Sequence, residues 1–177
     1  MKKLIVFEGC DGSGKSSCAI ELAKQINGIY YKTPPKIFEN LRESIEQKKD
    51  YNLRFYYYLS GTIYAANEIA EILKHNHVVC DRYIYSTIAY HRALGIAISG
   101  DLIKTVIQAD YAFCLYAEKE EVTRRIGQRK NLGAFDTDFN CQENVFQEFA
   151  KFPLEFFDTS GLKVEESVKK LLQKIYL

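Results

Sequence analysis

The stretch GCDGSGKS at residues 9–16 has the spacing G-x-x-x-x-G-K-[ST] of loops that hold phosphate groups. An apolar run at residues 4–7 precedes it, and residues 17–26 repeat apolar side chains at helical spacing. A strand, a glycine-rich turn and a helix N-terminus gather free backbone N–H groups and the positive end of the helix dipole at one point. The stretch therefore predicts a site for the phosphates of a nucleotide, and the flanking elements disfavour a chance match in an unrelated loop.

The residue types in this loop each have a predicted task. The glycines let the backbone approach phosphate oxygens closely. Lys15 would reach the β- and γ-phosphates of ATP, and the Ser16 hydroxyl would bind Mg²⁺. The residues predicted to bind ATP are Gly9, Asp11, Gly12, Ser13, Gly14, Lys15, Ser16 and Ser17.

An acidic and a basic residue, Asp81 and Arg82, follow the apolar run at residues 77–80. If that run is a parallel strand, its C-terminal end lies on the same edge of the sheet as the phosphate loop, where open α/β folds bind ligands. Asp81 is then a candidate to hold Mg²⁺ or one of its waters, and Arg82 is a candidate to contact the transferred phosphate. The alternative is an exposed ion pair in a surface loop.

A basic cluster that includes Arg124, Arg125 and Arg129 ends the charged stretch at residues 118–128. Two interpretations stay open. The cations can stabilise the C-terminal end of a helix, where the helix dipole is negative. They can instead belong to a mobile lid around residues 124–136 that carries arginines to a phosphoryl group.

The elements that must position these residues alternate along the chain. Apolar runs that predict strands are separated by stretches of helical spacing, and parallel strands need such crossovers. The sequence therefore predicts one domain over residues 1–177, with an α/β, three-layer P-loop NTPase fold and a parallel sheet of about five strands flanked by helices. The predicted strands lie at residues 4–7, 29–31, 77–80, 112–116 and 154–157. The predicted helices lie at residues 17–26, 83–94, 101–109, 118–128 and 164–175, with polar–apolar stretches at 36–49 and 51–75.

Composition narrows the class of protein. Of the 177 residues, 47% are apolar, and the formal net charge is +1, from 24 basic and 23 acidic side chains. This is an ordinary globular composition without a global attraction to nucleic acid or membranes, so neither is expected as a partner. The five cysteines contain no C-x-x-C pair, which favours neither disulfides nor zinc and indicates a reducing, cytoplasmic location. The first apolar run is too short for a signal peptide.

Several separate stretches resemble the thymidylate kinase family. FEGCDGSGKSS at residues 7–17 is similar to the phosphate loop of that family. DRY at residues 81–83, followed by STIAY at 86–90, is similar to its D-R-Y-x-x-S-x-x-A-Y segment. The basic cluster falls where the lid arginines of the family lie, and DTS at residues 158–160 falls near its adenine-side loop. The resemblance covers essentially the whole chain in the same order.

The resemblance implies transfer of the γ-phosphoryl group of ATP, with Mg²⁺, to a nucleoside monophosphate, with dTMP as the expected acceptor and dTDP as the product. It also implies a homodimer. By position, Arg82 would bridge donor and acceptor phosphates, and Asp11 would accept a hydrogen bond from the 3′-hydroxyl of the acceptor. Tyr57 would stack on the base, and Tyr90 would lie beside the sugar or base. The residues implied to be catalytic are Lys15, Arg82, Arg124 and Arg129, and those implied to hold the metal are Ser16 and Asp81.

Three features on the acceptor side depart from the family. Where the family has a T-R-E-P-type loop, this chain has KTPP at residues 32–35, in which Lys32 can replace the charge of an arginine but not its bidentate fork. Gly61 stands where an arginine usually reaches the acceptor. His91 stands at a frequent glutamine and is either a structural histidine or a base-contacting one. Two alternatives therefore stay open: the same fold acting on another nucleotide, a nucleoside or a small metabolite, or a nucleotide-binding regulatory protein with little activity.

Overall fold

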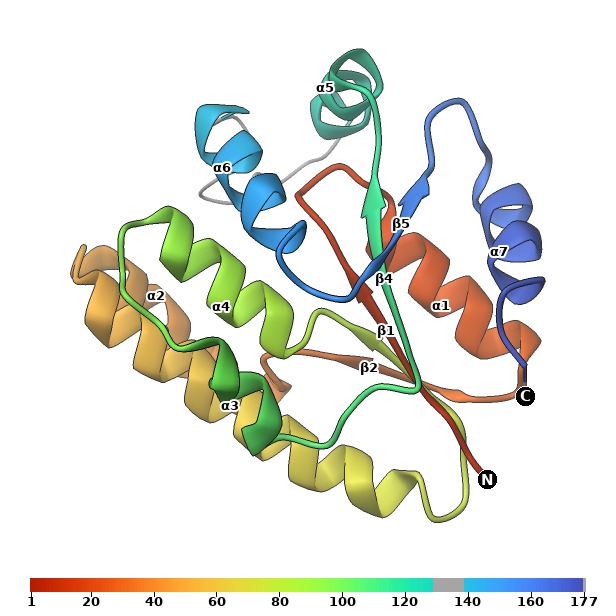
Figure 1. The fold of residues 1–177 in the computed structure, drawn as a ribbon, viewed down its shortest axis with the longest axis horizontal. Coiled ribbons are helices and arrows are strands. Elements are labelled where there is room, and N and C mark those ends of the chain that lie inside the picture. The colour runs from red at the N-terminus through yellow and green to blue at the C-terminus, as the bar shows by residue number, and fades with distance from the viewer. Residues whose placement is uncertain (129–138, 177) are drawn as a thin grey trace.

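A parallel sheet of five strands lies at the centre of the computed structural model, which describes residues 1–128 and 139–176 (Figure 1). The strand order is β2-β3-β1-β4-β5, and each neighbouring pair runs parallel. The five-stranded parallel sheet predicted from the sequence is thus confirmed. The strands are β1 Leu4–Glu8, β2 Ile29–Lys32, β3 Val78–Asp81, β4 Tyr111–Tyr116 and β5 Glu155–Asp158.

Helices cover both faces of this sheet, because each crossover between parallel strands returns over one face. The α-helices are α1 Lys15–Gln25, α2 Glu39–Gln47, α3 Tyr51–Ile72, α4 Ile84–Ala93, α5 Lys119–Gly127, α6 Phe139–Phe149 and α7 Val164–Leu172. Two short 3₁₀ helices are η1 Lys36–Phe38 and η2 Gly100–Thr105. In Figure 1, α1 and α7 lie on one side of the sheet, α3 and α4 lie on the other, and α5 follows the end of β4.

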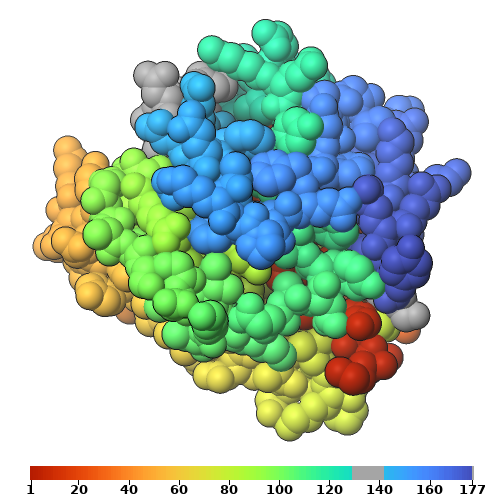
Figure 2. All heavy atoms as spheres, in the orientation of Figure 1, coloured from red at the N-terminus to blue at the C-terminus, as the bar shows by residue number. Residues whose placement is uncertain are grey.

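The central strand β1 divides the core into two halves through its alternating side chains. Leu4 and Val6 belong to the cluster formed with α3 and α4, whereas Ile5 and Phe7 belong to the cluster formed with α1 and α7. All four are buried, as expected of a strand covered on both faces. In Figure 2 the later segments cover most of the first strand, and the largest visible group of red atoms lies at the N-terminus.

The neighbouring strand β3 alternates in the same way. Val78 and Cys80 face the α3 and α4 half, and Val79 faces the α1 half. Because side chains two residues apart in a strand share a face, Asp81 lies on the α1 side of the sheet, the side on which the phosphate loop leads into its helix. The pleat of β3 therefore decides which half of the molecule receives this carboxylate.

One helix prediction is wrong, and one helix was missed. The helix predicted at residues 101–109 is wrong, because only the 3₁₀ segment η2 forms there. Gln108 donates from its side chain to the carbonyl oxygens of Ile103 and Val106, at 2.7 Å each, and so takes acceptors that a continuing helix would use. Conversely, α6 was not predicted, although its buried Val145 and Phe149 lie one helical turn apart. None of the helices in the described part of the chain has the length and apolar character needed to cross a membrane.

Candidate active site

The phosphate loop and the start of α4 meet at one edge of the sheet. The register of β1 against β3 pairs Phe7 with Asp81, so both chains leave the sheet at the same level. The backbone N–H of Arg82 then donates to the carbonyl of Phe7 at 2.9 Å, one residue beyond the strand. The edge predicted from the sequence is therefore the edge at which these residues gather.

The loop leads directly into the N-terminus of α1. Gly14 is the N-cap, with φ of +84°, and has no side chain that could bind the first N–H groups of the helix. Ser16 is half-buried in the first turn, and Ser17 beside it is exposed. Ser13 is buried, and its Oγ has no hydrogen-bonding partner among the described residues. An anion placed at this helix end would meet backbone donors and the positive end of the dipole.

Gly9 marks the closest backbone approach in the loop. A Cβ atom at this position would lie 2.1 Å from the carbonyl oxygen of Leu115 in β4, and the φ of Gly9 is +136°. No other residue fits this space or this backbone conformation without a shift of the sheet. The glycine thus allows the loop to turn tightly over the ends of β1 and β4.

Lys15 is buried in the loop as the first residue of α1. Its ammonium donates to the Cys10 carbonyl at 3.0 Å and lies 3.4 Å from Oδ1 of Asp11. Burial lowers the pKa of Lys15, and the Arg82 guanidinium lowers it further, while the Asp11 carboxylate opposes both. Two cations and one carboxylate are therefore crowded at this point, which is an arrangement that additional negative charge would stabilise.

Arg82 connects the loop to α4. Its Nη1 donates to the Gly9 carbonyl at 3.1 Å and to Ser86 Oγ at 3.2 Å, and its Nη2 donates to Asp11 Oδ1 at 2.6 Å. The guanidinium also lies 5.0 Å from the centre of the Tyr90 ring. The backbone of Arg82 has φ of +67°, a left-handed conformation that is strained for a residue with a side chain. Such strain persists only where surrounding contacts stabilise it. Here the strained backbone places a guanidinium against the phosphate loop.

Glu8, the last residue of β1, holds the N-terminus of α4. It is 0% exposed, and its Oε1 accepts the backbone N–H groups of Tyr83 at 2.9 Å and Ser86 at 3.2 Å, while Oε2 accepts the Ser86 hydroxyl. Burial raises the pKa of Glu8 to about 7, although the Ser86 hydroxyl and the Arg82 guanidinium oppose this rise. The carboxyl group therefore caps α4 from another element and fixes the turn that carries Arg82.

Exchanging Glu8 for Gln is expected to flatten the pH dependence of stability. The carboxyl pKa is raised from 4.5 to about 7 on folding, so the native state binds the extra proton between these values and the free energy of unfolding falls as pH rises through them. The total fall is roughly 3 kcal/mol. Glutamine keeps an acceptor for both N–H groups and a donor for Ser86 without a titrating group, so urea unfolding between about pH 5 and pH 8 should lose this slope.

The control for this comparison is Glu8→Ala. It leaves the two backbone N–H groups without their acceptor and also removes the titrating carboxyl group, so we expect it to be less stable than Glu8→Gln by about 2–4 kcal/mol at every pH. Parallel pH curves for the parent protein and Glu8→Gln would contradict the assignment of this titration to Glu8.

Asp81 presents one unused carboxylate oxygen. The residue is 1% exposed; Oδ2 accepts the Tyr30 hydroxyl at 3.1 Å, and Oδ1 is buried with no hydrogen-bonding partner among the described residues. A buried, unpaired carboxylate oxygen fits a nearby cation or a water that a cation holds. Within residues 1–128 and 139–176, no three His, Cys, Asp or Glu side chains gather into a metal-binding group by themselves. This donor set suits Mg²⁺, which usually takes one or two protein ligands together with substrate phosphates and water.

Of the two adjacent arginines in α5, Arg125 contacts the phosphate loop. It donates to the Gly12 carbonyl at 3.2 Å, to Thr159 Oγ1 at 2.9 Å and to the Thr159 carbonyl at 2.8 Å. The side chain of Arg124 is 58% exposed and binds Glu121, which also accepts a hydrogen bond from Arg125. Successive residues on a helix point about 100° apart, so only one of the pair can face the loop. The described contacts therefore bring Arg125, and not Arg124, to the phosphate loop, while a catalytic role for Arg124 stays a prediction.

The other predicted lid residues lie partly beyond the described chain. Arg129, and with it most of the predicted lid at residues 124–136, lies outside the described residues. Thr159, from the predicted adenine-side loop, donates to the Ser13 carbonyl at 2.9 Å and so joins that loop to the phosphate loop. No role was predicted for Glu8, and the contacts of Arg125 and Thr159 with the phosphate loop were not predicted either. Only Glu8 carries a local signal, because it is an acidic residue at the end of an apolar run.

On the acceptor side, Tyr57 lies in an aromatic cluster. Its hydroxyl donates to the Phe38 carbonyl at 2.8 Å, and its ring meets the Phe38 ring edge-on, with centres 6.0 Å apart. Stacking of Tyr57 on a base stays a prediction. Gly61, one turn further along α3, lies against the KTPP loop, since a Cβ there would be 2.9 Å from the Pro34 Cβ. The space in which an arginine would begin at this position is therefore already filled by Pro34.

His91 is a buried histidine between α3 and α4. Its Nδ1 lies 2.7 Å from the Thr87 carbonyl, and because a carbonyl only accepts, Nδ1 carries the proton. The ring packs against Phe55 and Tyr58, with centres 5.5 Å and 5.8 Å away. Burial lowers the pKa of His91 to about 4, so it is neutral at physiological pH. These contacts support the structural interpretation over a base-contacting one.

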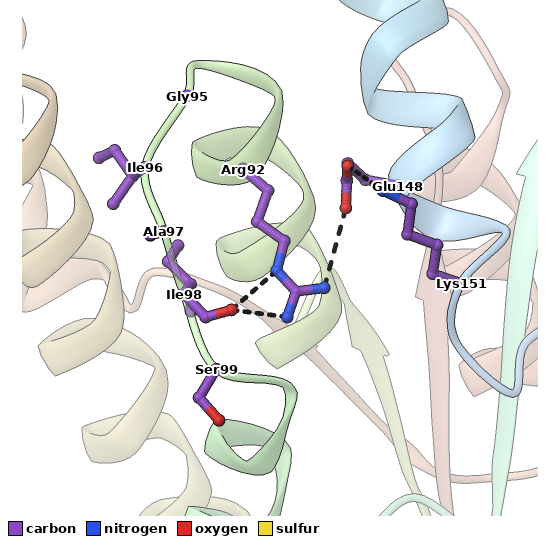
Figure 3. A pocket seen from close by; sticks show the side chains of 8 residues that line it. All are labelled: Arg92, Gly95, Ile96, Ala97, Ile98, Ser99, Glu148 and Lys151. Carbon is purple, nitrogen blue, oxygen red and sulfur yellow. Dashed lines mark hydrogen bonds and ion pairs between the residues drawn. The ribbon is translucent and has the colours of Figure 1, made fainter.

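A surface cavity of about 590 Å³ lies between the end of α4 and the end of α6, and none of its residues was predicted for the site (Figure 3). Arg92 donates to the Ile98 carbonyl at 3.0 Å and 2.7 Å and lies 3.8 Å from Glu148. Figure 3 shows the guanidinium between the loop before η2 and α6. Arg92 is already bound by these groups, and Lys151 is bound by Glu148, so we interpret the cavity as a structural contact between α4 and α6.

Comparisons with known proteins agree over the whole chain. A family model described as thymidylate kinase matches residues 7–175. Proteins named probable thymidylate kinase from Methanococcus aeolicus and Methanococcus vannielii are each 31% identical over 99% of this chain, and the matches cover 96% and 92% of those proteins. The thymidylate kinase structure from Candida albicans covers 98% of this chain and 91% of its own, with a TM-score of 0.79 and 22% identity. That from Ehrlichia chaffeensis covers 99% of both chains, with a TM-score of 0.72 and 20% identity. At these identities the two structures support the fold.

Proposed function

The chain belongs to the thymidylate kinase family, and we propose that the phosphate loop, Arg82 and Asp81 together carry its activity. That activity is the transfer of the γ-phosphoryl group of ATP to dTMP, which forms dTDP. The observation that carries the proposal is the position of the Arg82 guanidinium, which is bonded to the phosphate loop at Gly9 and Asp11. A cation at that junction can contact both the donor and the acceptor phosphate.

On the donor side, the loop at residues 9–17 would bind the phosphates of ATP. Lys15 would leave the Cys10 carbonyl to neutralise the β- and γ-phosphates, for which its buried charge is already placed. Arg125 would keep the loop in shape from the side of α5 through Gly12. Phosphoryl transfer needs positioning and charge stabilisation more than covalent chemistry, so these cations suffice without a strong base.

The donor side also includes a proposed Mg²⁺ site at Ser16 and Asp81. It is supported by the unpaired, buried Oδ1 of Asp81 and by the half-buried Ser16 in the first turn of α1. When bound, the ion supplies charge neutralisation and orientation of the ATP phosphates. What the chain itself contributes is a fixed carboxylate and a hydroxyl on the α1 side of the sheet.

On the acceptor side, Arg82 would bind the acceptor phosphate, and Asp11 would accept a hydrogen bond from the 3′-hydroxyl. Tyr90 lies under the Arg82 guanidinium, which suits a place beside the sugar. Tyr57 is proposed to stack on the base. A lid around residues 124–136 is proposed to cover the transfer, with Arg129 and Arg124 as its candidate catalytic arginines and Arg125 as the one whose contacts with the phosphate loop are described.

Assembly and location are further proposals. A homodimer is supported by the exposed apolar side chains of Leu53, Tyr56 and Ile63 along one side of α3, which a partner could cover. A reducing, cytoplasmic location is supported by Cys18, Cys80 and Cys114, which are buried and form no disulfide.

A second candidate keeps the enzyme and changes the preferred acceptor. It is favoured by one contact, because Pro34 fills the space that an arginine at Gly61 would need. An acceptor that depends on that arginine would lose a bidentate contact here. Other nucleotides, nucleosides or small phosphorylated metabolites could then be used at rates closer to that of dTMP.

The experiment is an acceptor panel with ATP and Mg²⁺, in which nucleotide products and ADP release are measured by chromatography. We expect dTDP from dTMP, and a preference for dTMP over dUMP and dGMP below about 100-fold, which corresponds to roughly 2.7 kcal/mol of transition-state preference. A preference well above that range would refute the second candidate. Absence of dTDP with all preparations that bind ATP would refute the proposed roles.

A further inference from the structure

The hydroxyl of Tyr30 is the one described group that holds the carboxylate of Asp81. Tyr30 lies in β2, where it pairs with Val79 of β3, and Lys32 pairs with Asp81. Residues two apart in neighbouring parallel strands share a face, so Tyr30, Val79 and Asp81 all lie on the α1 side of the sheet. The Tyr30 ring extends along this face, and its hydroxyl donates to Asp81 Oδ2 at 3.1 Å.

This single hydrogen bond makes the two oxygens of Asp81 unequal. Oδ2 is occupied by the phenol, and Oδ1 is buried and has no hydrogen-bonding partner within the described residues. The terminal torsion of an aspartate is soft, so a carboxylate with no fixed partner samples many orientations. A phenol is a neutral donor at physiological pH and therefore fixes the plane of the carboxylate without neutralising its charge.

The ring and the hydroxyl of Tyr30 have separate roles, one in packing and one in hydrogen bonding. The ring packs with the apolar cluster formed by α1, α7 and the sheet, which a phenylalanine would do equally well. The hydroxyl adds nothing to that packing and makes its contact only with Asp81 in the described structure. Its presence is therefore explained by the carboxylate.

We infer that Tyr30 is a positioning residue, which orients Asp81 so that Oδ1 is directed to Mg²⁺ or to a water of its shell. The inference rests on the proposed metal role of Asp81. Removing a group that orients a metal ligand in this way commonly lowers metal affinity by about 10–100-fold. Tyr30 has no recognisable signal in the sequence, where it is one aromatic residue in a predicted strand.

The test compares Tyr30→Phe with Tyr31→Phe. Tyr31 is the next residue of β2, faces the other side of the sheet, and donates its hydroxyl to Glu68, so its substitution removes a hydroxyl of the same strand without touching Asp81. Binding of Mn²⁺ in the presence of ADP, measured by electron paramagnetic resonance, reports the metal site without turnover. The Mg²⁺ concentration for half-maximal dTDP formation and the affinity for ATP in EDTA are measured alongside.

We expect Tyr30→Phe to weaken Mn²⁺ binding and to raise the Mg²⁺ requirement by about tenfold, with ATP affinity in EDTA unchanged. Tyr31→Phe should leave all three quantities unchanged. Unchanged metal binding in Tyr30→Phe, or equal shifts in both variants, would overturn the inference. A third variant, Asp81→Asn, separates the two levels: if it weakens Mn²⁺ binding while Tyr30→Phe does not, the metal site stands and only the role of Tyr30 fails. If neither variant weakens it, the metal assignment fails as well.

Discussion

Replacing Arg82 by glycine is expected to lower kcat/KM for dTDP formation by on the order of 10³-fold, while costing less stability than the alanine substitution. The loss of activity follows from the removal of a guanidinium that is bonded to Gly9 and Asp11, at the point where donor and acceptor phosphates would meet. A preorganised cation at such a point stabilises charge that develops in the transition state, and water does not replace it.

The stability difference follows from the backbone of Arg82. Its φ of +67° is strained for any residue with a Cβ atom and free of strain for glycine. Arg82→Gly and Arg82→Ala lose the same guanidinium contacts, so the difference between them isolates this backbone strain. We expect the glycine variant to be more stable by about 1 kcal/mol in urea unfolding.

A third substitution tests the shape of the cation. Arg82→Lys keeps the charge but cannot donate to Gly9, Ser86 and Asp11 at once, so its activity should fall between those of the parent protein and Arg82→Gly. If Arg82→Gly retained activity within about tenfold of the parent, no bridging role for this residue could be kept.

Replacing Lys15 by methionine is the second change for which we expect an effect on the order of 10³-fold on kcat. Methionine keeps the length and apolar character of the side chain and removes only the ammonium. The reason for the loss is that Lys15 is the buried cation nearest to the start of α1, where the β- and γ-phosphates are proposed to bind. The measurement is dTDP formation at saturating dTMP and Mg²⁺, with ATP affinity determined separately.

The same variant should not lose stability. Burial lowers the pKa of Lys15, which means that folding opposes the charged form of this group. Asp11 stays paired with Arg82 when the ammonium is removed, so no carboxylate is left buried and unpaired. Urea unfolding of Lys15→Met should therefore equal or exceed that of the parent protein.

Lys24→Met is the matched control, since Lys24 lies in the last turn of the same helix and is exposed. It should leave both kcat and stability unchanged. A kcat of Lys15→Met within about tenfold of the parent value would contradict the proposed role of the phosphate loop in phosphoryl transfer. Turnover abolished by this one substitution would rule out the alternative of a regulatory protein with little activity.

The sequence alone determined those features that depend on neighbours in the chain. The phosphate loop at residues 9–16 is local, because its glycines, its lysine and the first turn of α1 follow one another directly. The inner strands β1 and β3 were recognisable because parallel strands buried on both faces are continuous apolar runs. The meeting of Arg82 with this loop was also predictable, since the C-terminal ends of parallel strands share one edge.

The tertiary structure decided the contacts between segments that are far apart in the chain. Glu8 and Ser86, or Tyr30 and Asp81, meet only because β1 and β2 both lie beside β3, and no local pattern states which strands are neighbours. That Arg125 and not Arg124 contacts the loop depends on the rotation of α5 about its axis, which its packing against the loop fixes. The effect of Gly61 likewise depends on Pro34, which packs against it. Steric exclusion of this kind acts between surfaces and leaves no periodic pattern in the sequence.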